Sequence, residues 1–218
     1  MPAGPIAVIG GTGKLGTAIA RRLAKAGRQV IIGSRSAQSA SNTAAEVGHG
    51  LTGLSNADAA AACSIVLVTV PFAAQEATLA EIAPHVCGKI VVDTTVPLVP
   101  PRVMRVQMPP EGSAAQRAQR LLGPQVTVVS AFHNVAAHKL ATDQDIDCDV
   151  LVFGDDKDAR AQVVALVELT GMRGVHGGAL ANSAAAEALT SVLIFINKTY
   201  QVDGAALHIT GSLGRPAA

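Results

Sequence analysis

The chain has 218 residues, and 17 Lys and Arg nearly balance 16 Asp and Glu to give a net charge of +1. Aromatic residues make up 2% of the chain, with one Tyr and no Trp. This composition excludes the basic stripe and the aromatic stacking platforms on which nucleic-acid binding depends.

Short β-branched runs alternate with alanine-rich stretches along the chain. Such runs are typical of strands that are buried on both faces of a parallel sheet. The first run follows the N-terminus almost directly, so no signal peptide is readable and we expect a cytoplasmic protein. Six strands are predicted, at Ile6–Ile9, Gln29–Ile32, Ile65–Val70, Ile90–Val92, Val126–Val129 and Val150–Phe153.

The alternation predicts an α/β fold, namely a doubly wound, mostly parallel Rossmann sheet with a small C-terminal helical segment. We expect residues 1–180 to form the dinucleotide-binding domain. Residues 181–218 would form the helical segment. No internal repeat divides the chain further.

A glycine-rich motif, Gly11-Thr12-Gly13-Lys14-Leu15-Gly16, follows the first strand and opens a helix. In this context the three glycines permit a tight turn, a close approach to a pyrophosphate, and packing of the helix on the strand. The free N–H groups and the dipole of the helix then favour the phosphates. The motif predicts a dinucleotide site, and the alternative is a glycine-rich turn without a ligand.

The second predicted strand runs into Gly33-Ser34-Arg35-Ser36. At this point NAD-specific proteins place an Asp or Glu on the ribose 2′-hydroxyl. No carboxylate stands at this strand end to repel a 2′-phosphate, whereas a guanidinium and hydroxyl groups would bind one. We therefore predict NADP(H) as the cofactor, held by Ser34 and Arg35. The alternative is that Arg35 is a solvated surface arginine.

Three further strand ends should border the ribose and the nicotinamide. Ligands of open α/β sheets bind outside the carboxyl ends of the strands, and this rule brings Val70 with Pro71, Val96, and His133 to one crevice. The strand-end position makes His133 the histidine best placed for a functional role. A structural histidine is the equally weighted alternative.

The three cysteines, Cys63, Cys87 and Cys148, lack the spacing of a disulfide framework or a zinc site. We expect all three to be reduced and buried. No metal site is predicted.

Residues 96–112 contain five of the eleven prolines, so they cannot form a central strand or a helix interior. We predict a long surface loop, which is either part of the active site or a tolerated insertion.

One helix is predicted from Ser183 to Lys198, and it is apolar on more than one face. Leu193 belongs to the main apolar stripe, and Phe195 lies off it. Such a helix is wrapped by its own domain or packed against another chain. Its strongly apolar part, residues 188–196, is shorter than the ~20 residues of a membrane span, so we expect no membrane partner.

These motifs resemble the coenzyme F420-dependent NADP oxidoreductases, in the same order and over most of the chain. The matching segments are Gly10–Gly16, Val30–Arg35, Thr69–Pro71, Val96–Pro97, Ser130–His133, Gly154–Asp156, Gly178–Ser183 and Glu187–Thr190. Several of these are too long for a general Rossmann likeness.

The resemblance implies an oxidoreductase that transfers a hydride between NADP(H) and the deazaflavin coenzyme F420, and that forms a homodimer. It implies that the two rings stack, with residues 133–135, including His133 and Val135, beside them and Thr190 near the cofactor amide. Residues 181–218 would then carry the acceptor site and the dimer contacts. The chain departs from the family at 134–136, where Thr-Ile-Pro is frequent, and at Phe72, where Trp is common.

Hydride transfer between two planar rings requires positioning and exclusion of water rather than a nucleophile or a metal. Two alternatives stay open. One is an NADPH-dependent reductase of a carbonyl, imine or pterin, with His133 as the catalytic proton donor and Lys139 or Tyr200 as weaker candidates. The other is a non-catalytic NADP(H)-sensing protein. Arg102 and Arg105 in the proline-rich loop either meet the anionic side chain of the deazaflavin or are solvated.

Overall fold

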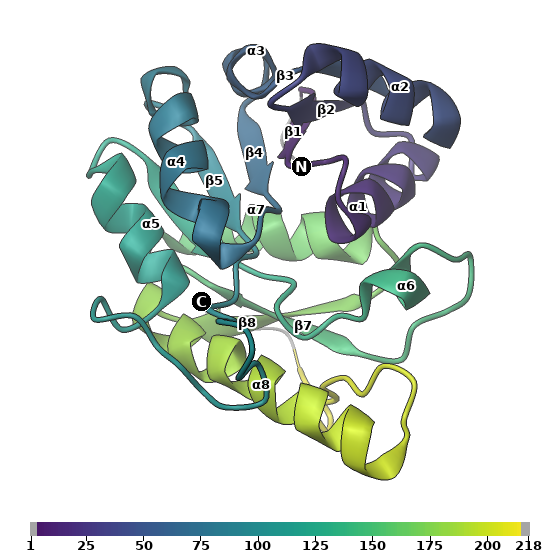
Figure 1. Ribbon diagram of the computed structural model, residues 1–218, viewed down its shortest axis with the longest axis vertical. Coiled ribbons are helices and arrows are strands. Elements are labelled where there is room, and N and C mark those ends of the chain that lie inside the picture. The colour runs from purple at the N-terminus through teal and green to yellow at the C-terminus, as the bar shows by residue number, and fades with distance from the viewer. Residues whose placement is uncertain (1–3, 215–218) are drawn as a thin grey trace.

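The computed structural model describes residues 4–214, which form one eight-stranded sheet with helices on both faces (Figure 1). The strand order is β3-β2-β1-β4-β5-β6-β7-β8, and β6 and β7 are the antiparallel pair. The strands are β1 (Ile6–Ile9), β2 (Val30–Ser34), β3 (Thr52–Ser55), β4 (Ile65–Val68), β5 (Ile90–Asp93), β6 (Thr127–Ser130), β7 (Asp149–Phe153) and β8 (Arg173–Gly178).

Within residues 4–214, eight α-helices connect and follow these strands. They are α1 (Lys14–Lys25), α2 (Ala37–Val47), α3 (Asn56–Ala62), α4 (Phe72–Ile82), α5 (Ala114–Leu122), α6 (Ala137–Leu140), α7 (Lys157–Glu168) and α8 (Ser183–Tyr200). Two short 3-10 turns, Ala83–His85 and Leu180–Asn182, follow α4 and precede α8.

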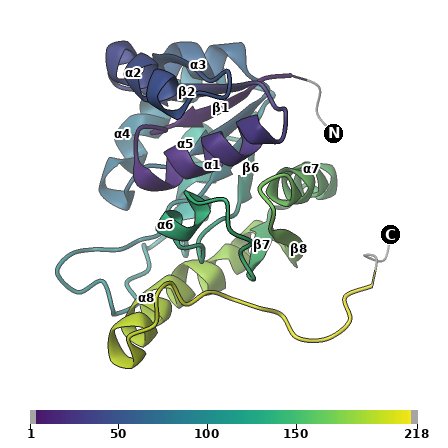
Figure 2. The same ribbon diagram turned by 90° about the vertical axis from the view of Figure 1, so that its right-hand side faces the viewer.

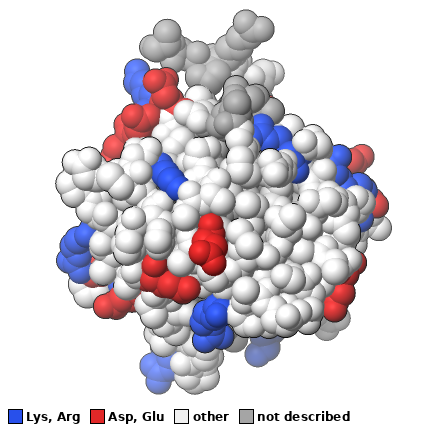
Figure 3. All heavy atoms as spheres, turned by 90° about the horizontal axis from the view of Figure 1, so that it is seen from above, with Lys and Arg blue, Asp and Glu red and all other residues white. Residues whose placement is uncertain are grey.

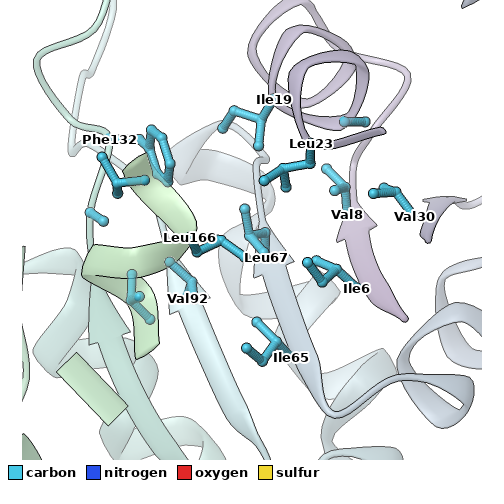
Figure 4. Packing of buried hydrophobic residues seen from close by; sticks show 14 of the residues in the cluster. Ile6, Val8, Ile19, Leu23, Val30, Ile65, Leu67, Val92, Phe132 and Leu166 are labelled. Carbon is cyan, nitrogen blue, oxygen red and sulfur yellow. The ribbon is translucent and has the colours of Figure 1, made fainter. Parts of the chain in front are cut away.

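Alternate residues of each central strand pack into two separate cores. Ile6 and Val8 of β1 face α1, α2 and α7, whereas Ala7 and Ile9 face α3, α4 and α5. Figure 4 shows Ile19 and Leu23 of α1 over the first of these cores. Each fully buried aliphatic side chain stabilises the fold by roughly 1.5–3 kcal/mol. The doubly wound, mostly parallel Rossmann sheet that the sequence predicts is confirmed.

All six predicted strands are present with small shifts of their bounds, but two strands were not predicted. The edge strand β3 has the sequence TGLS, and β8 has the sequence RGVHGG. Both contain glycine and are partly exposed, so neither has the apolar run of a central strand. The expectation of three buried cysteines is wrong for Cys87, which is exposed; Cys63 and Cys148 are buried, and all three are free.

Helix α8 lies along one end of the molecule, beside the loop of residues 96–112 (Figures 1 and 2). The segment Leu180–Tyr200 is long and apolar enough to cross a membrane by length and composition alone. Its buried face is not uniformly apolar, however, because Ser183, Glu187 and Ser191 point into the protein. Such a polar face belongs to a helix that packs on its own domain.

Charged side chains are scattered over the surface. On the face shown in Figure 3, Lys and Arg are mixed with Asp and Glu, and neither sign forms a continuous stripe there. This distribution agrees with the net charge of +1.

Candidate functional site

The parallel strands bring the predicted site residues to one edge of the sheet, in spatial order. Ser34 and Arg35 lie at the end of β2, and the turn of residues 10–16 follows β1. Val70 follows β4, Val96 follows β5 and His133 follows β6. Neighbouring strands lie about 4.8 Å apart, so the four steps from β2 to β6 span about 19 Å. This edge of the sheet is long enough for an extended dinucleotide followed by a second ring.

The turn between β1 and α1 requires glycine at positions 10, 11 and 16, and a Cβ on Gly11 would lie 2.6 Å from the main-chain oxygen of Val8. Gly10 has a φ of +73°. A Cβ on Gly16 would collide with the Thr69 side chain and lie 2.8 Å from Gly11 Cα. A Cβ on Gly13, by contrast, would have the Gly10 oxygen at 3.3 Å as its nearest neighbour. Gly16 is therefore required for packing, whereas Gly13 leaves space above the turn.

The first turn of α1 presents donors that the protein leaves free. The N-cap residue Gly13 supplies no side-chain cap. Within residues 4–214, the N–H groups of Lys14, Leu15 and Gly16 have no backbone partner. Unpaired N–H groups at a helix N-terminus form an anion site. The residues present thus fit a pyrophosphate.

A pocket of about 370 Å³ extends from this turn to the end of β2. It gathers Thr12 and Gly13 with Ser34, Arg35, Val70 and Pro71, as the sequence predicts. Arg35 is exposed and has no hydrogen-bond or ion-pair partner in the described part of the chain. Its guanidinium is therefore free to bind a 2′-phosphate.

Part of the lining of this pocket was not predicted. It includes Asn56 at the start of α3 and Glu81 near the end of α4, and Asn56 Nδ2 donates to Glu81 Oε2 over 2.9 Å. No carboxylate stands at the end of β2 itself, but α4 brings this one to the same pocket. Sequence reasoning missed Asn56 because it follows β3, which was not predicted.

A second pocket, of about 380 Å³, lies between the chain after β6 and α8. It brings together three predicted residues, His133, Val135 and Thr190, which come from elements far apart in sequence. Asn134, which lies inside the predicted segment 133–135, also lines it, and so do Asn197 and residues 202–205, which were not predicted individually. The segment after α8 is held there by Asn197, whose Oδ1 accepts from the N–H of Ala205 over 2.7 Å.

Hydrogen bonds between α8 and the chain after β6 fix this second pocket. Thr190 Oγ1 donates to the main-chain oxygen of His133 over 3.0 Å. Asn134 Nδ2 donates to Thr190 Oγ1 over 3.1 Å and to the oxygen of Ala186 over 2.9 Å. Residues 133 and 134 are therefore held by one turn of α8.

The His133 side chain is 6% exposed, and its Nε2 lies 2.8 Å from Ser130 Oγ at the end of β6. Burial lowers the pKa of His133 to about 4. The imidazole is therefore neutral near pH 7 and is a poor proton donor. This environment suits a residue that orders the site better than a general acid.

The remaining predicted residues lie outside both pockets. Val96 is half-buried beyond β5 and lines neither one. Arg102 and Arg105 are exposed in the loop, which has no helix or strand between residues 96 and 112. Within residues 4–214 no group of three His, Cys, Asp or Glu side chains could hold a metal ion.

Comparison with known proteins gives a consistent result. Residues 5–97 match the family model described as NADP oxidoreductase coenzyme F420-dependent. The chain is 41% identical to the F420-dependent NADP reductase of Methanothermobacter thermautotrophicus, over 94% of each chain. It is 38% identical to the protein of the same name from Methanothermobacter marburgensis, over 94% of this chain and 97% of the relative.

A similar structure has also been solved. A crystal structure from Arthrobacter sp. FB24, provisionally described as an F420-dependent NADP-reductase, superimposes with a TM-score of 0.83 at 28% identity. The match covers 94% of this chain and 99% of the other. The similarity is therefore not limited to the dinucleotide-binding part of the chain.

Proposed function

Because the chain belongs to the family of coenzyme F420-dependent NADP oxidoreductases, we propose that it transfers a hydride between NADP(H) and the deazaflavin coenzyme F420. The partners are small-molecule redox substrates. The observation that carries the proposal is the alignment of two pockets along one sheet edge, one beside an anion site and an unpaired arginine, the other beyond it under α8. Anaerobic mixing of protein, NADPH and oxidised F420 tests it.

The NADP(H) half is assigned to residues 1–180. The pyrophosphate would bind at the turn and the first turn of α1, and the 2′-phosphate at Ser34 and Arg35. Val70, Pro71 and Val96 would border the ribose and the nicotinamide. The residues that we assign to NADP(H) binding here are Gly11, Thr12, Gly13, Lys14, Leu15, Gly16, Ser34, Arg35, Val70, Pro71 and Val96.

The acceptor half is assigned to the second pocket and thus to the contact of residues 133–135 with segment 181–218. His133 and Val135 would lie beside the rings, and Thr190 near the cofactor amide. NADPH supplies the hydride when it is bound. The protein's own task is to align the two rings at reaction distance and to keep water out.

The state of His133 favours this reaction over reduction of a carbonyl or an imine. Such a reduction requires a proton donor beside the substrate oxygen or nitrogen. A buried imidazole with a pKa of about 4 is unprotonated at the pH of the cytoplasm. Exchange of a hydride between two rings makes no such demand on His133.

A homodimer is part of the proposal. Phe195 and Val192 of α8 are 53% and 43% exposed, and Val99 and Val106 in the neighbouring loop are also exposed apolar residues. An apolar surface of this kind is suited to a second copy of the chain. We also assign the protein to the cytoplasm, without nucleic-acid or membrane partners.

A further inference from the structure

A stripe of polar residues runs along the buried side of α8. Ser183, Glu187 and Ser191 are spaced one helical turn apart, and all three are buried. Ser183 Oγ donates to Ser113 Oγ over 2.8 Å, and Ser191 Oγ donates to the oxygen of Arg105 over 3.4 Å. The stripe therefore faces the proline-rich loop and the residues that follow it.

Glu187 makes the strongest of these contacts. Its Oε2 accepts from the N–H of Ala114 over 2.6 Å, and its Oε1 accepts from the N–H of Ala115 over 3.1 Å. These are the first two N–H groups of α5, which have no partner inside their own helix. The N-cap residue Ser113 cannot serve them, because its hydroxyl accepts from the N–H of Gln116. A carboxylate from α8 thus caps α5 at the point where the loop ends.

The beginning of the loop is tied to the same place. Gln75 Nε2 donates to Asp93 Oδ2 at the end of β5 over 2.6 Å, and to the oxygen of Ala114 over 3.0 Å. Asp93 Oδ1 in turn accepts from the N–H of Thr95 over 2.6 Å. A buried polar chain, Asp93, Gln75, Ala114 and Glu187, therefore joins both ends of loop 96–112 to α8.

The adjacent face of α8 holds the acceptor pocket. Ala186 and Thr190, the residues next to Glu187 along the helix surface, bind residues 133 and 134. One turn of α8 is thus fixed to the loop on one side and to the pocket on the other.

We propose that Glu187 is a positioning residue for the acceptor half of the site. By capping α5 it holds loop 96–112 against α8, and it fixes the turn of α8 that carries Thr190. The proposal rests on the proposed function, because it assumes that F420 occupies the second pocket. Loss of the Glu187 carboxylate should weaken F420 binding while NADPH binding is kept.

The environment of Glu187 makes this contact sensitive to pH. Burial raises the pKa of Glu187 to about 7, the N–H groups of Ala114 and Ala115 oppose the rise, and the charge of Asp93 adds to it. The Ser183 hydroxyl, which also hydrogen-bonds to Glu187 and opposes the rise, carries no charge. Gln75 and Ser113, which contact Ala114 and Ser183 beside it, are uncharged as well. The ionised carboxylate accepts from both N–H groups, whereas protonation weakens this acceptance. Acidification through pH 7 should therefore loosen the loop.

The test compares Glu187→Gln with the wild type and with Glu168→Gln, a matched change at an exposed position of α7. An amide offers one acceptor oxygen in place of two, so Glu187→Gln should raise the KM for F420 about fivefold or more. The Kd for NADPH should change less than twofold. Trypsin should cut after Arg102 and Arg105 several-fold faster. In the wild type the KM for F420 should rise as the pH falls from 8 to 6, and Glu187→Gln should lack this rise.

Two results would overturn the proposal. One is an unchanged KM together with an unchanged rate of tryptic cleavage in Glu187→Gln. The other is an equal weakening of NADPH and F420 binding, which would make Glu187 a general support of the fold. If Glu187→Gln does not fold, a flat pH profile of the wild-type KM overturns the proposal, and a rise below pH 7 supports it. If the wild type does not reduce F420 at all, the proposed function fails, and cleavage of the loop still tests the contact.

Discussion

Thr190 Oγ1 donates a hydrogen bond to the main-chain oxygen of His133 across 3.0 Å, and so joins two residues that are 57 positions apart in the sequence. The same oxygen accepts from Asn134 Nδ2 at 3.1 Å. One hydroxyl group thus connects α8 to the chain that follows β6. This connection gives the second pocket its shape, because both partners line it.

Replacement of Thr190 by Val keeps the shape of the side chain but removes both hydrogen bonds. We expect the KM for F420 to rise several-fold, because one neutral hydrogen bond contributes about 1 kcal/mol. Thr190→Ser keeps the hydroxyl and should stay close to the wild type. Equal KM values in Thr190→Val and Thr190→Ser would show that the hydroxyl has no such role.

Replacement of Arg35 by Ala should distinguish the two nicotinamide cofactors. A hydrogen bond to a charged group contributes about 1.5–3 kcal/mol, so NADPH binding should weaken by roughly 10- to 100-fold. NADH lacks the 2′-phosphate, and its Kd should stay within about twofold. Titration calorimetry with both cofactors measures this, with Arg120→Ala, a mostly exposed arginine on α5, as the control. Equal losses for NADPH and NADH would contradict the assignment of Arg35.

The neutral, buried state of His133 should be visible in the stability of the protein. Its pKa in the fold is about 4, whereas the ordinary value is 6.5. The unfolded chain therefore binds the proton more readily, and stability that is present above pH 6.5 is lost as the pH falls towards 4. A shift of this size corresponds to about 3 kcal/mol.

Urea unfolding of the wild type and of His133→Asn between pH 4 and 7 isolates this effect, because all other titrating groups are common to both proteins. The difference between the two free energies of unfolding should shrink as the pH falls from 6.5 to 4. Parallel curves would mean that His133 is accessible and charged in the fold. In that case its role as a proton donor would have to be reconsidered.

If the proposed dimer forms through the exposed face of α8, a charge introduced there should disrupt the association of the two chains. Phe195→Glu should convert a dimer into a monomer, because a carboxylate buried in an apolar interface would lose its hydration. Leu121→Glu introduces the same charge at a leucine of α5 that is also exposed, and it should leave the dimer intact. Sedimentation velocity separates the two outcomes. A wild-type protein that sediments as a monomer would rule out the dimer.

The sequence predicts those parts of the fold and the site whose signals are local. The glycine motif, Ser34 with Arg35, and the six apolar strands each occupy a few consecutive residues, and the rule for strand ends places them at one edge. The expectation that 183–198 is one helix is likewise supported by α8 (Ser183–Tyr200).

Other features depend on contacts between distant segments and have no local signal. Asn56 and Glu81 enter the NADP(H) pocket from α3 and α4, and the strand before α3 is short and contains glycine. Glu187 lies in a segment that resembles the family, but nothing in its neighbours reveals that the first N–H groups of α5 lie opposite it. Such residues become visible only when the packing is known.

The most direct measurement mixes the purified protein with NADPH and oxidised F420 under anaerobic conditions and follows the absorbance of the deazaflavin. The absorbance of oxidised F420 should disappear with the oxidation of an equal amount of NADPH, and the rate with NADH at the same concentration should be far lower. Binding of NADPH without loss of the deazaflavin absorbance would contradict the assignment of the second pocket, and would favour another small acceptor.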